Sequence, residues 1–178
     1  MAASGIKTDR LVLVPWSAEH TELLARLSSI PEVMIFIESG DVWSRAKAEE
    51  VASAARQHWA EHGFGWRAAI ERASGDFIGF LALNFAGDGT ARVDADEYEI
   101  GWWMEPAVWG QGFAGEGGAA IRDEALGELN APSVIARIQP SNARSIAVAE
   151  SLGLTPDTVT TGKSGEPVSV YRLIASPD

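Results

Sequence analysis

The residues best suited to chemistry form a glycine-rich stretch near the middle of the chain, Trp109-Gly110-Gln111-Gly112-Phe113-Ala114-Gly115-Glu116. Pro106, just before it, cannot donate to a sheet ladder, so we expect a strand to end near Met104 and the glycines to turn tightly into a helix. The first N–H groups of a helix lack intrahelical partners and carry the positive end of the helix dipole. The stretch therefore predicts a loop that holds a phosphate or pyrophosphate through its main chain.

The same stretch contains Gly110-x-Gly112-x-x-Gly115, which matches the glycine pattern of dinucleotide-binding folds. In those folds the first glycine follows a strand almost directly, and an acidic residue ends the next strand. Here five residues separate Met104 from Gly110, and the next expected strand ends at Arg137-Ile138-Gln139. Dinucleotide binding is therefore disfavoured, although it stays open as an alternative.

A second short motif, His58-x-x-Glu61-His62, resembles an inverted zinc-hydrolase sequence. The two histidines would share one face of a helix, but they lie in its last turn before Gly63, where the helix dipole favours histidine without any metal. The motif also lacks a third ligand. We expect no metal site here.

Composition narrows the classes of protein that the chain can represent. Its 178 residues, 46% of them apolar, are expected to form a single domain over residues 1–178. Because the formal net charge is −11, a nucleic-acid partner is disfavoured, whereas a cationic partner such as an amine would be attracted. The chain has no cysteine, no signal peptide pattern over Met1 to Lys7 and no long apolar run, which predicts a cytoplasmic protein that does not bind membranes.

Helix and strand signals alternate along the chain. We expect helices that begin after Ser17 and Ser44, near Phe113, and after Asn142, the second ending at Gly63 and the last at Leu152-Gly153. A short turn or helix is expected after Pro31. Strands are expected over residues 10–15, 66–71, 77–85, 97–104, 134–138, 155–161 and 168–174, with a glycine-containing loop over residues 86–95. This order predicts an α/β chain with a mixed sheet and helices on its faces.

Four segments in register resemble the GNAT superfamily of acyl-CoA-dependent N-acyltransferases, in particular its RimJ/RimL-type branch. They are Thr8-Asp9-Arg10-Leu11-Val12-Leu13, Phe77-Ile78-Gly79, the span from Glu99 through Glu116, and Asn142-Ala143-Arg144-Ser145 with Leu152-Gly153-Leu154. The resemblance covers most of the chain. It implies a single-domain α/β (α+β) fold with a mixed, mostly antiparallel, twisted sheet that is splayed at its central strand.

The resemblance also implies that acetyl-CoA is the cosubstrate and that no metal is needed. It assigns the cofactor contacts to Trp102, Trp103 and Met104 in the central strand, to Gln111, Gly112, Phe113, Ala114 and Gly115 in the loop, and to Asn142, which also suits a helix cap. Trp109 stands where the superfamily pattern has glutamine or arginine. Gly115, Gly117 and Gly118 depart from the alanine or threonine expected in this helix, and they would either loosen its start or permit close packing.

The chemistry implied is direct transfer of an acetyl group from the thioester to a primary amine, on a protein N-terminus or a small molecule. A base must accept the amine's proton, and Glu99 is the candidate because strand alternation puts it on the face of Gly101 and Trp103. The alternative is that Glu99 is a solvated or salt-bridged strand carboxylate. Many members protonate the leaving thiolate with a tyrosine, but Ala149 stands at that position, so Ser145 or water would serve. A catalytically decayed CoA-binding module is the other alternative, and the chain is expected to be a monomer or a homodimer.

Overall fold

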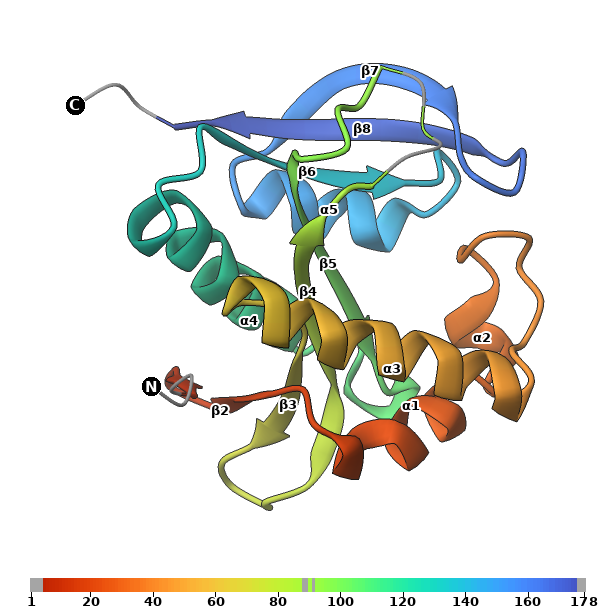
Figure 1. The fold of residues 1–178 in the computed structure, drawn as a ribbon, viewed down its shortest axis with the longest axis vertical. Coiled ribbons are helices and arrows are strands. Elements are labelled where there is room, and N and C mark those ends of the chain that lie inside the picture. Colours follow the sequence, from red (N-terminus) through yellow and green to blue (C-terminus); the bar gives the residue numbers. More distant parts are fainter. Residues whose placement is uncertain (1–4, 88–89, 91, 176–178) are drawn as a thin grey trace.

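The computed structural model of the protein describes residues 5–87, 90 and 92–175, and the strands of this part form one eight-stranded sheet. Figure 1 shows the sheet with its helices. The strands are β1 (Ile6–Lys7), β2 (Leu11–Pro15), β3 (Arg67–Glu71), β4 (Phe77–Phe85), β5 (Tyr98–Met104), β6 (Ser133–Ile138), β7 (Thr155–Thr161) and β8 (Pro167–Ile174). The helices are α1 (Thr21–Leu27), α2 (Pro31–Met34), α3 (Arg45–His62), α4 (Phe113–Asp123) and α5 (Ala143–Ser151).

The sheet has the order β1-β2-β3-β4-β5-β6-β8-β7, and its neighbouring strands are antiparallel except for β5 and β6. These two strands run parallel and pair only where Tyr98 faces Val134 and Glu99 faces Ile135. From Ile100 onward β5 pairs with β4 alone. The predicted mixed, mostly antiparallel sheet with a splayed central strand is thus confirmed.

Local signals set the ends of the helices. The Ser44 side chain accepts a hydrogen bond from the Lys47 N–H at 3.2 Å, and Gly63 closes α3 in the left-handed region with φ of 76°. The segment after Ser17 differs from the expected single helix, because a 3₁₀ turn (Ala18–His20) precedes α1. Asp88, Gly89 and Ala91 of the predicted loop lie outside the described residues, as do the first four residues of the Met1 to Lys7 segment.

The sequence did not indicate β1 or the π-helical turn (Glu124–Glu128) that continues α4. Glu124, the first residue of that turn, accepts two hydrogen bonds of 2.6 Å from the guanidinium of Arg67 on β3. Arg67 is only 2% exposed and also lies over the Trp59 ring at 4.8 Å. This bidentate pair joins the turn to the sheet, and losing one partner would leave a buried charge.

Two apolar clusters cover opposite faces of the sheet. Alternation along β4 directs Phe80 toward α1 and α3, whereas Leu81 faces α4. A Cβ on Gly117 would lie 2.9 Å from Leu81, and one on Gly118 would lie 2.8 Å from Leu152. These two glycines therefore permit close packing, whereas a Cβ on Gly115 would make only an ordinary 3.7 Å contact. None of the described helices is long and apolar enough to cross a bilayer.

Candidate active site

The glycine-rich loop enters α4 through two left-handed glycines, as its sequence predicts. Gly110 has φ of 75°, and Gly112, the residue that caps α4, has φ of 81°. Both values lie where residues with a Cβ are strained, so the glycines are needed for this path. The main-chain N–H groups of Phe113, Ala114 and Gly115 then fall in the first helical turn, where helices lack internal acceptors. The loop has the donors and the dipole that suit an anion.

A cavity of about 470 Å³ lies between this loop, the splayed end of β5 and the start of α5. Nine of the eleven predicted site residues line it: Trp102, Trp103, Met104, Gly112, Phe113, Ala114, Gly115, Asn142 and Ser145. A smaller cavity of about 80 Å³ is bordered by Trp102, Trp103, Asn142 and Ser145 as well. The structure therefore brings residues from three separate segments of the chain to one place.

The other two predicted residues, Gln111 and Glu99, do not line either cavity. Gln111 lies in the loop, but its side-chain amide donates to the Ala107 carbonyl at 3.0 Å. Its own carbonyl accepts a hydrogen bond of 2.8 Å from the guanidinium of Arg10. Any part of Gln111 in binding would thus belong to its main chain.

Hydrogen bonds hold the wall of the cavity in place. The indole of Trp102 donates to the Ser145 hydroxyl at 3.3 Å, and Asn142 caps α5 by accepting the Ser145 N–H at 3.2 Å. The capping function predicted for Asn142 is confirmed. The indole of Trp109 donates to the Met104 carbonyl at 2.8 Å, so that carbonyl already has a partner. The Glu105 N–H donates to the Ile78 carbonyl, so strand alternation directs the main-chain groups of Trp103 toward β4 and leaves those of Trp102 for an extended ligand at the splay.

Glu99 forms a bidentate ion pair with Arg137 of β6, with N–O distances of 2.7 and 2.6 Å. Arg137 also donates to the Thr90 hydroxyl at 2.5 Å and to the Ala86 carbonyl at 3.2 Å. Burial by itself lowers the pKa of Arg137, but the hydrogen bonds and charge of Glu99 outweigh it and raise that pKa. Arg137 borders the smaller cavity, whereas Glu99 does not. The assignment of Glu99 as the base stays a prediction.

The position of the missing tyrosine acid lies in the core. Ala149 is fully buried on α5, with no hydroxyl to offer a leaving thiolate. Ser145 is the hydroxyl-bearing residue of the prediction that does line the cavity, four residues earlier on the same helix. Its role as an acid also stays a prediction.

The His58 and His62 rings lie against each other with centroids 4.5 Å apart, packed on Phe64 and Phe85. Among the described residues no cluster of three or more His, Cys, Asp or Glu could hold a metal ion. The pKa of His58 is lowered, first by burial and then by the neighbouring His62, while Glu61 opposes the shift. The pair thus has the surroundings of a packed aromatic cluster.

This arrangement predicts a loss of stability in mild acid. A histidine whose pKa is lower in the folded state binds its proton more readily when unfolded, so the free energy of unfolding falls as pH decreases from about 6.5, the unfolded value. His20, whose pKa burial also lowers, acts in the same direction. We expect His58→Phe to flatten the fall in melting temperature between pH 7 and pH 5, measured by calorimetry. An unchanged slope would contradict this assignment.

Several cavity residues were not predicted from the sequence. Arg144, whose guanidinium lies 4.8 Å from the Trp109 ring centroid, borders the cavity beside the loop. Glu32, Phe36 and Ile37 border it from the opposite side, in and after α2. Arg144 stands within the Asn142–Ser145 motif and could have been noticed there, because it provides a cation beside the loop predicted to bind an anion. The α2 residues carry no such signal.

Comparison with known proteins agrees with these features. The family model described as an acetyltransferase (GNAT) domain matches residues 10–155. FsC-acetyl coenzyme A-N(2)-transacetylase of Aspergillus fumigatus is 32% identical over 161 residues, which cover 84% of this chain and 64% of that protein. The chain thus spans 64% of the length of this curated relative.

Solved structures share the fold. An acetyltransferase from Agrobacterium tumefaciens superposes with a TM-score of 0.81 at 26% identity, covering 97% of this chain and 95% of the other. The ribosomal L7/L12 alpha-N-protein acetyltransferase RimL, solved with coenzyme A, has a TM-score of 0.76 at 16% identity and covers 98% of this chain and 100% of its own. At that identity the second likeness concerns the fold alone.

Proposed function

The chain belongs to the GNAT family of acetyltransferases, and on that premise we propose that it transfers an acetyl group from acetyl-CoA to a primary amine. The observation that carries the proposal is the 470 Å³ cavity, which joins the glycine loop to the splayed end of β5. The pyrophosphate oxygens of CoA would accept hydrogen bonds from the main-chain N–H groups of Gly112 to Gly115. The pantetheine arm would then extend along Trp102 and Trp103 as a strand-like partner.

The acceptor would approach from the α2 side. Glu32 and Arg144 are the charged residues among the described lining of the cavity, and they lie on different walls. Arg144, beside the loop, suits the phosphates, whereas the carboxylate of Glu32 suits a protonated amine. The net charge of −11 acts in the same direction over longer range. The name of the Aspergillus relative also describes a nitrogen acceptor, as this proposal does.

The reaction needs a proton acceptor and a donor. An amine must lose a proton to attack the thioester carbon, and the thiolate of CoA then takes one as the thioester bond breaks. We assign the first step to Glu99 acting through a water molecule, since its ion-pair partner Arg137 borders the smaller cavity and Glu99 does not. Ser145 or a water would supply the second proton. Whether the acceptor is a protein N-terminus or a small molecule, the cytoplasmic location and the oligomeric state stay predictions.

Calorimetric titration with acetyl-CoA, CoA and NAD tests the cofactor. We expect the first two to bind and NAD not to bind, because no acidic side chain ends β6 to hold a ribose. Tighter binding of NAD than of acetyl-CoA would contradict the proposal and favour the dinucleotide alternative. A panel of N-terminal peptides and small amines, followed by release of the CoA thiol, then tests transfer. Binding of acetyl-CoA without thiol release on any amine would indicate a decayed CoA-binding module.

A further inference from the structure

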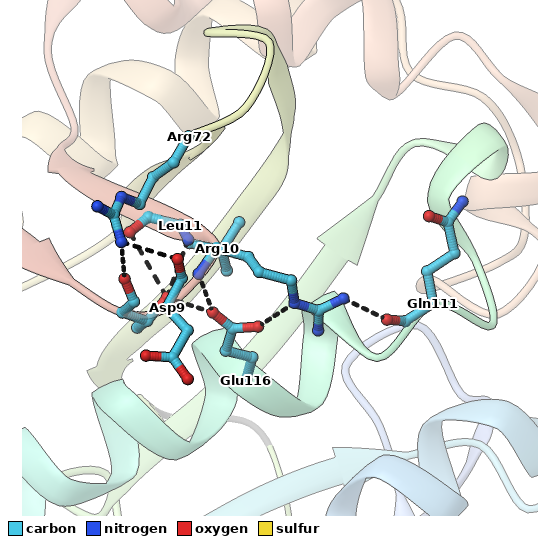
Figure 2. Close-up of polar contacts among 7 residues, drawn as sticks. Asp9, Arg10, Leu11, Arg72, Gln111 and Glu116 are labelled. Atoms are coloured by element: carbon cyan, nitrogen blue, oxygen red, sulfur yellow. Dashed lines mark hydrogen bonds and ion pairs between the residues drawn. The ribbon is translucent and has the colours of Figure 1, made fainter.

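The turn between β1 and β2 contacts the first turn of α4 through one carboxylate. Glu116 accepts hydrogen bonds from the Thr8 hydroxyl at 2.5 Å, from the Arg10 N–H at 2.7 Å and from the Arg10 guanidinium at 2.6 Å (Figure 2). Arg72 holds the same turn by donating to the carbonyls of Thr8 and Asp9 at 2.9 and 2.7 Å. Residues more than a hundred positions apart are thus joined by an ordered set of charge-assisted bonds.

Glu116 needs this pairing because it lies in the first turn of α4, close to where an anion would bind. Burial by itself raises the pKa of Glu116, but the hydrogen bonds from Thr8 and Arg10 outweigh it and lower that pKa. The carboxylate therefore stays ionised, and an unpaired negative charge there would repel a phosphate. The Arg10 guanidinium offsets that charge and directs the carboxylate toward the N-terminal turn, as Figure 2 shows.

Arg10 also reaches the glycine loop. Its guanidinium lies 4.3 Å from the Phe113 ring centroid, and its second terminal nitrogen lies 3.4 Å from where a Cβ on Gly112 would be. Its first terminal nitrogen donates to the Gln111 carbonyl at 2.8 Å. Because a trans peptide is planar, its C=O and N–H point in opposite directions. When the Gln111 carbonyl points at Arg10, the N–H of Gly112 points away from it.

We propose that Arg10 is a positioning residue for cofactor binding: anchored by Glu116, it orients the Gln111–Gly112 peptide so that the Gly112 N–H faces the pyrophosphate of CoA. The inference rests on the proposed acetyl-CoA site. Arg10 is suited to this task because its planar guanidinium donates in two fixed directions at once, to the carboxylate and to the carbonyl. A lysine has the charge but lacks this fork.

The test compares two ligands that share the thioester arm, acetyl-CoA and S-acetylpantetheine, of which only the first has a pyrophosphate. Both dissociation constants are measured, the weaker one by ligand-observed NMR at millimolar concentration. We expect Arg10→Met to weaken acetyl-CoA binding about tenfold or more and to leave S-acetylpantetheine binding unchanged. Arg10→Lys should behave like Arg10→Met. Arg45→Met is the matched control, since Arg45 is also exposed and paired with carboxylates, those of Glu22 and Glu49.

Each outcome separates the two claims. If the parent binds acetyl-CoA no more tightly than S-acetylpantetheine, the pyrophosphate site of the proposed function is wrong. If the parent and Arg10→Met both prefer acetyl-CoA over S-acetylpantetheine by the same factor, the positioning role is wrong. It is also wrong if Arg10→Met weakens the binding of both ligands in parallel, or if Arg10→Lys binds acetyl-CoA as tightly as the parent. Should Arg10→Met fail to fold, Glu116→Gln takes its place, because it keeps the side-chain shape and removes the charge that anchors Arg10. It should show the same selective loss, and an unchanged ratio of affinities would overturn the inference.

Discussion

Replacing Gly112 by aspartate should weaken acetyl-CoA binding about tenfold or more relative to replacing it by asparagine. Gly112 caps α4 and lines the cavity, so a carboxylate here stands close to the proposed pyrophosphate. A side chain at this position would also meet Arg10, because its Cβ would lie 3.4 Å from the guanidinium. The aspartate would therefore repel the ligand and compete with Gln111 and Glu116 for the same arginine.

Asparagine is the matched control because both residues have similar shape and tolerate the left-handed conformation better than other side chains. The strain at φ of 81° is thus nearly the same in the two variants, and their difference reports the charge. Dissociation constants from calorimetry, together with melting temperatures, would measure it. Equal affinities for Gly112→Asp and Gly112→Asn in folded protein would show that no phosphate approaches this residue.

Glu99→Gln should lower turnover by roughly a hundredfold or more at neutral pH, which is the usual size of a general-base contribution. The affinity for acetyl-CoA should stay near that of the parent. A carboxylate has about four lone-pair sites, and the bidentate contact with Arg137 occupies two. The remaining sites can receive a proton through water. Glutamine keeps the size and much of the hydrogen bonding, so a loss confined to kcat reports proton transfer.

Arg137→Lys is the control that separates this role from a structural one. It weakens the bidentate pair but leaves the Glu99 carboxylate in place. If Glu99 is the base, Arg137→Lys should retain most of the turnover that Glu99→Gln loses. Equal losses in the two variants, together with equal falls in melting temperature, would assign Glu99 to an ion pair that joins β5 to β6. The measurement requires an acceptor from the amine panel.

Features encoded by neighbouring residues could be predicted well. Ser44 and Gly63 mark the ends of α3 because capping and left-handed closure depend on the residue at one position. Gly110 and Gly112 specify the entry to α4 for the same reason, since few other residues adopt φ near 80°. Nine of the eleven predicted site residues line the cavity, and four of them belong to the entry of α4. The order of the elements indicated a mixed α/β sheet, and the resemblance to the GNAT superfamily indicated that the sheet is mostly antiparallel and splayed at its central strand.

Pairings between distant residues could not be predicted in the same way. With 25 acidic and 14 basic residues, a sequence permits far too many ion pairs for composition to select one. The sequence indicated Glu99 as a candidate base but not its partner, and the pairing of β5 with β6 placed Arg137 beside it. Likewise, the sequence did not decide whether Gly117 and Gly118 loosen the helix or permit close packing. The structure places Leu81 against Gly117 and Leu152 against Gly118, which shows that they permit close packing. Strand order and register, which depend on the whole core, decided these contacts.

Local sequence thus specified where the glycine-rich loop starts and which helix it enters, because glycine conformation and helix capping are local properties of the chain. Only the tertiary structure brought Arg10 to Glu116 and Gln111, and α2 to the far wall of the cavity. These contacts form when the apolar faces of the sheet and helices pack together. The hydrophobic effect that drives this packing is nondirectional, so it does not specify which polar groups at the surface come into contact. The direction of the loop's main-chain N–H groups therefore depends on tertiary contacts such as that of Arg10 with the Gln111 carbonyl, and could not be predicted from the local sequence.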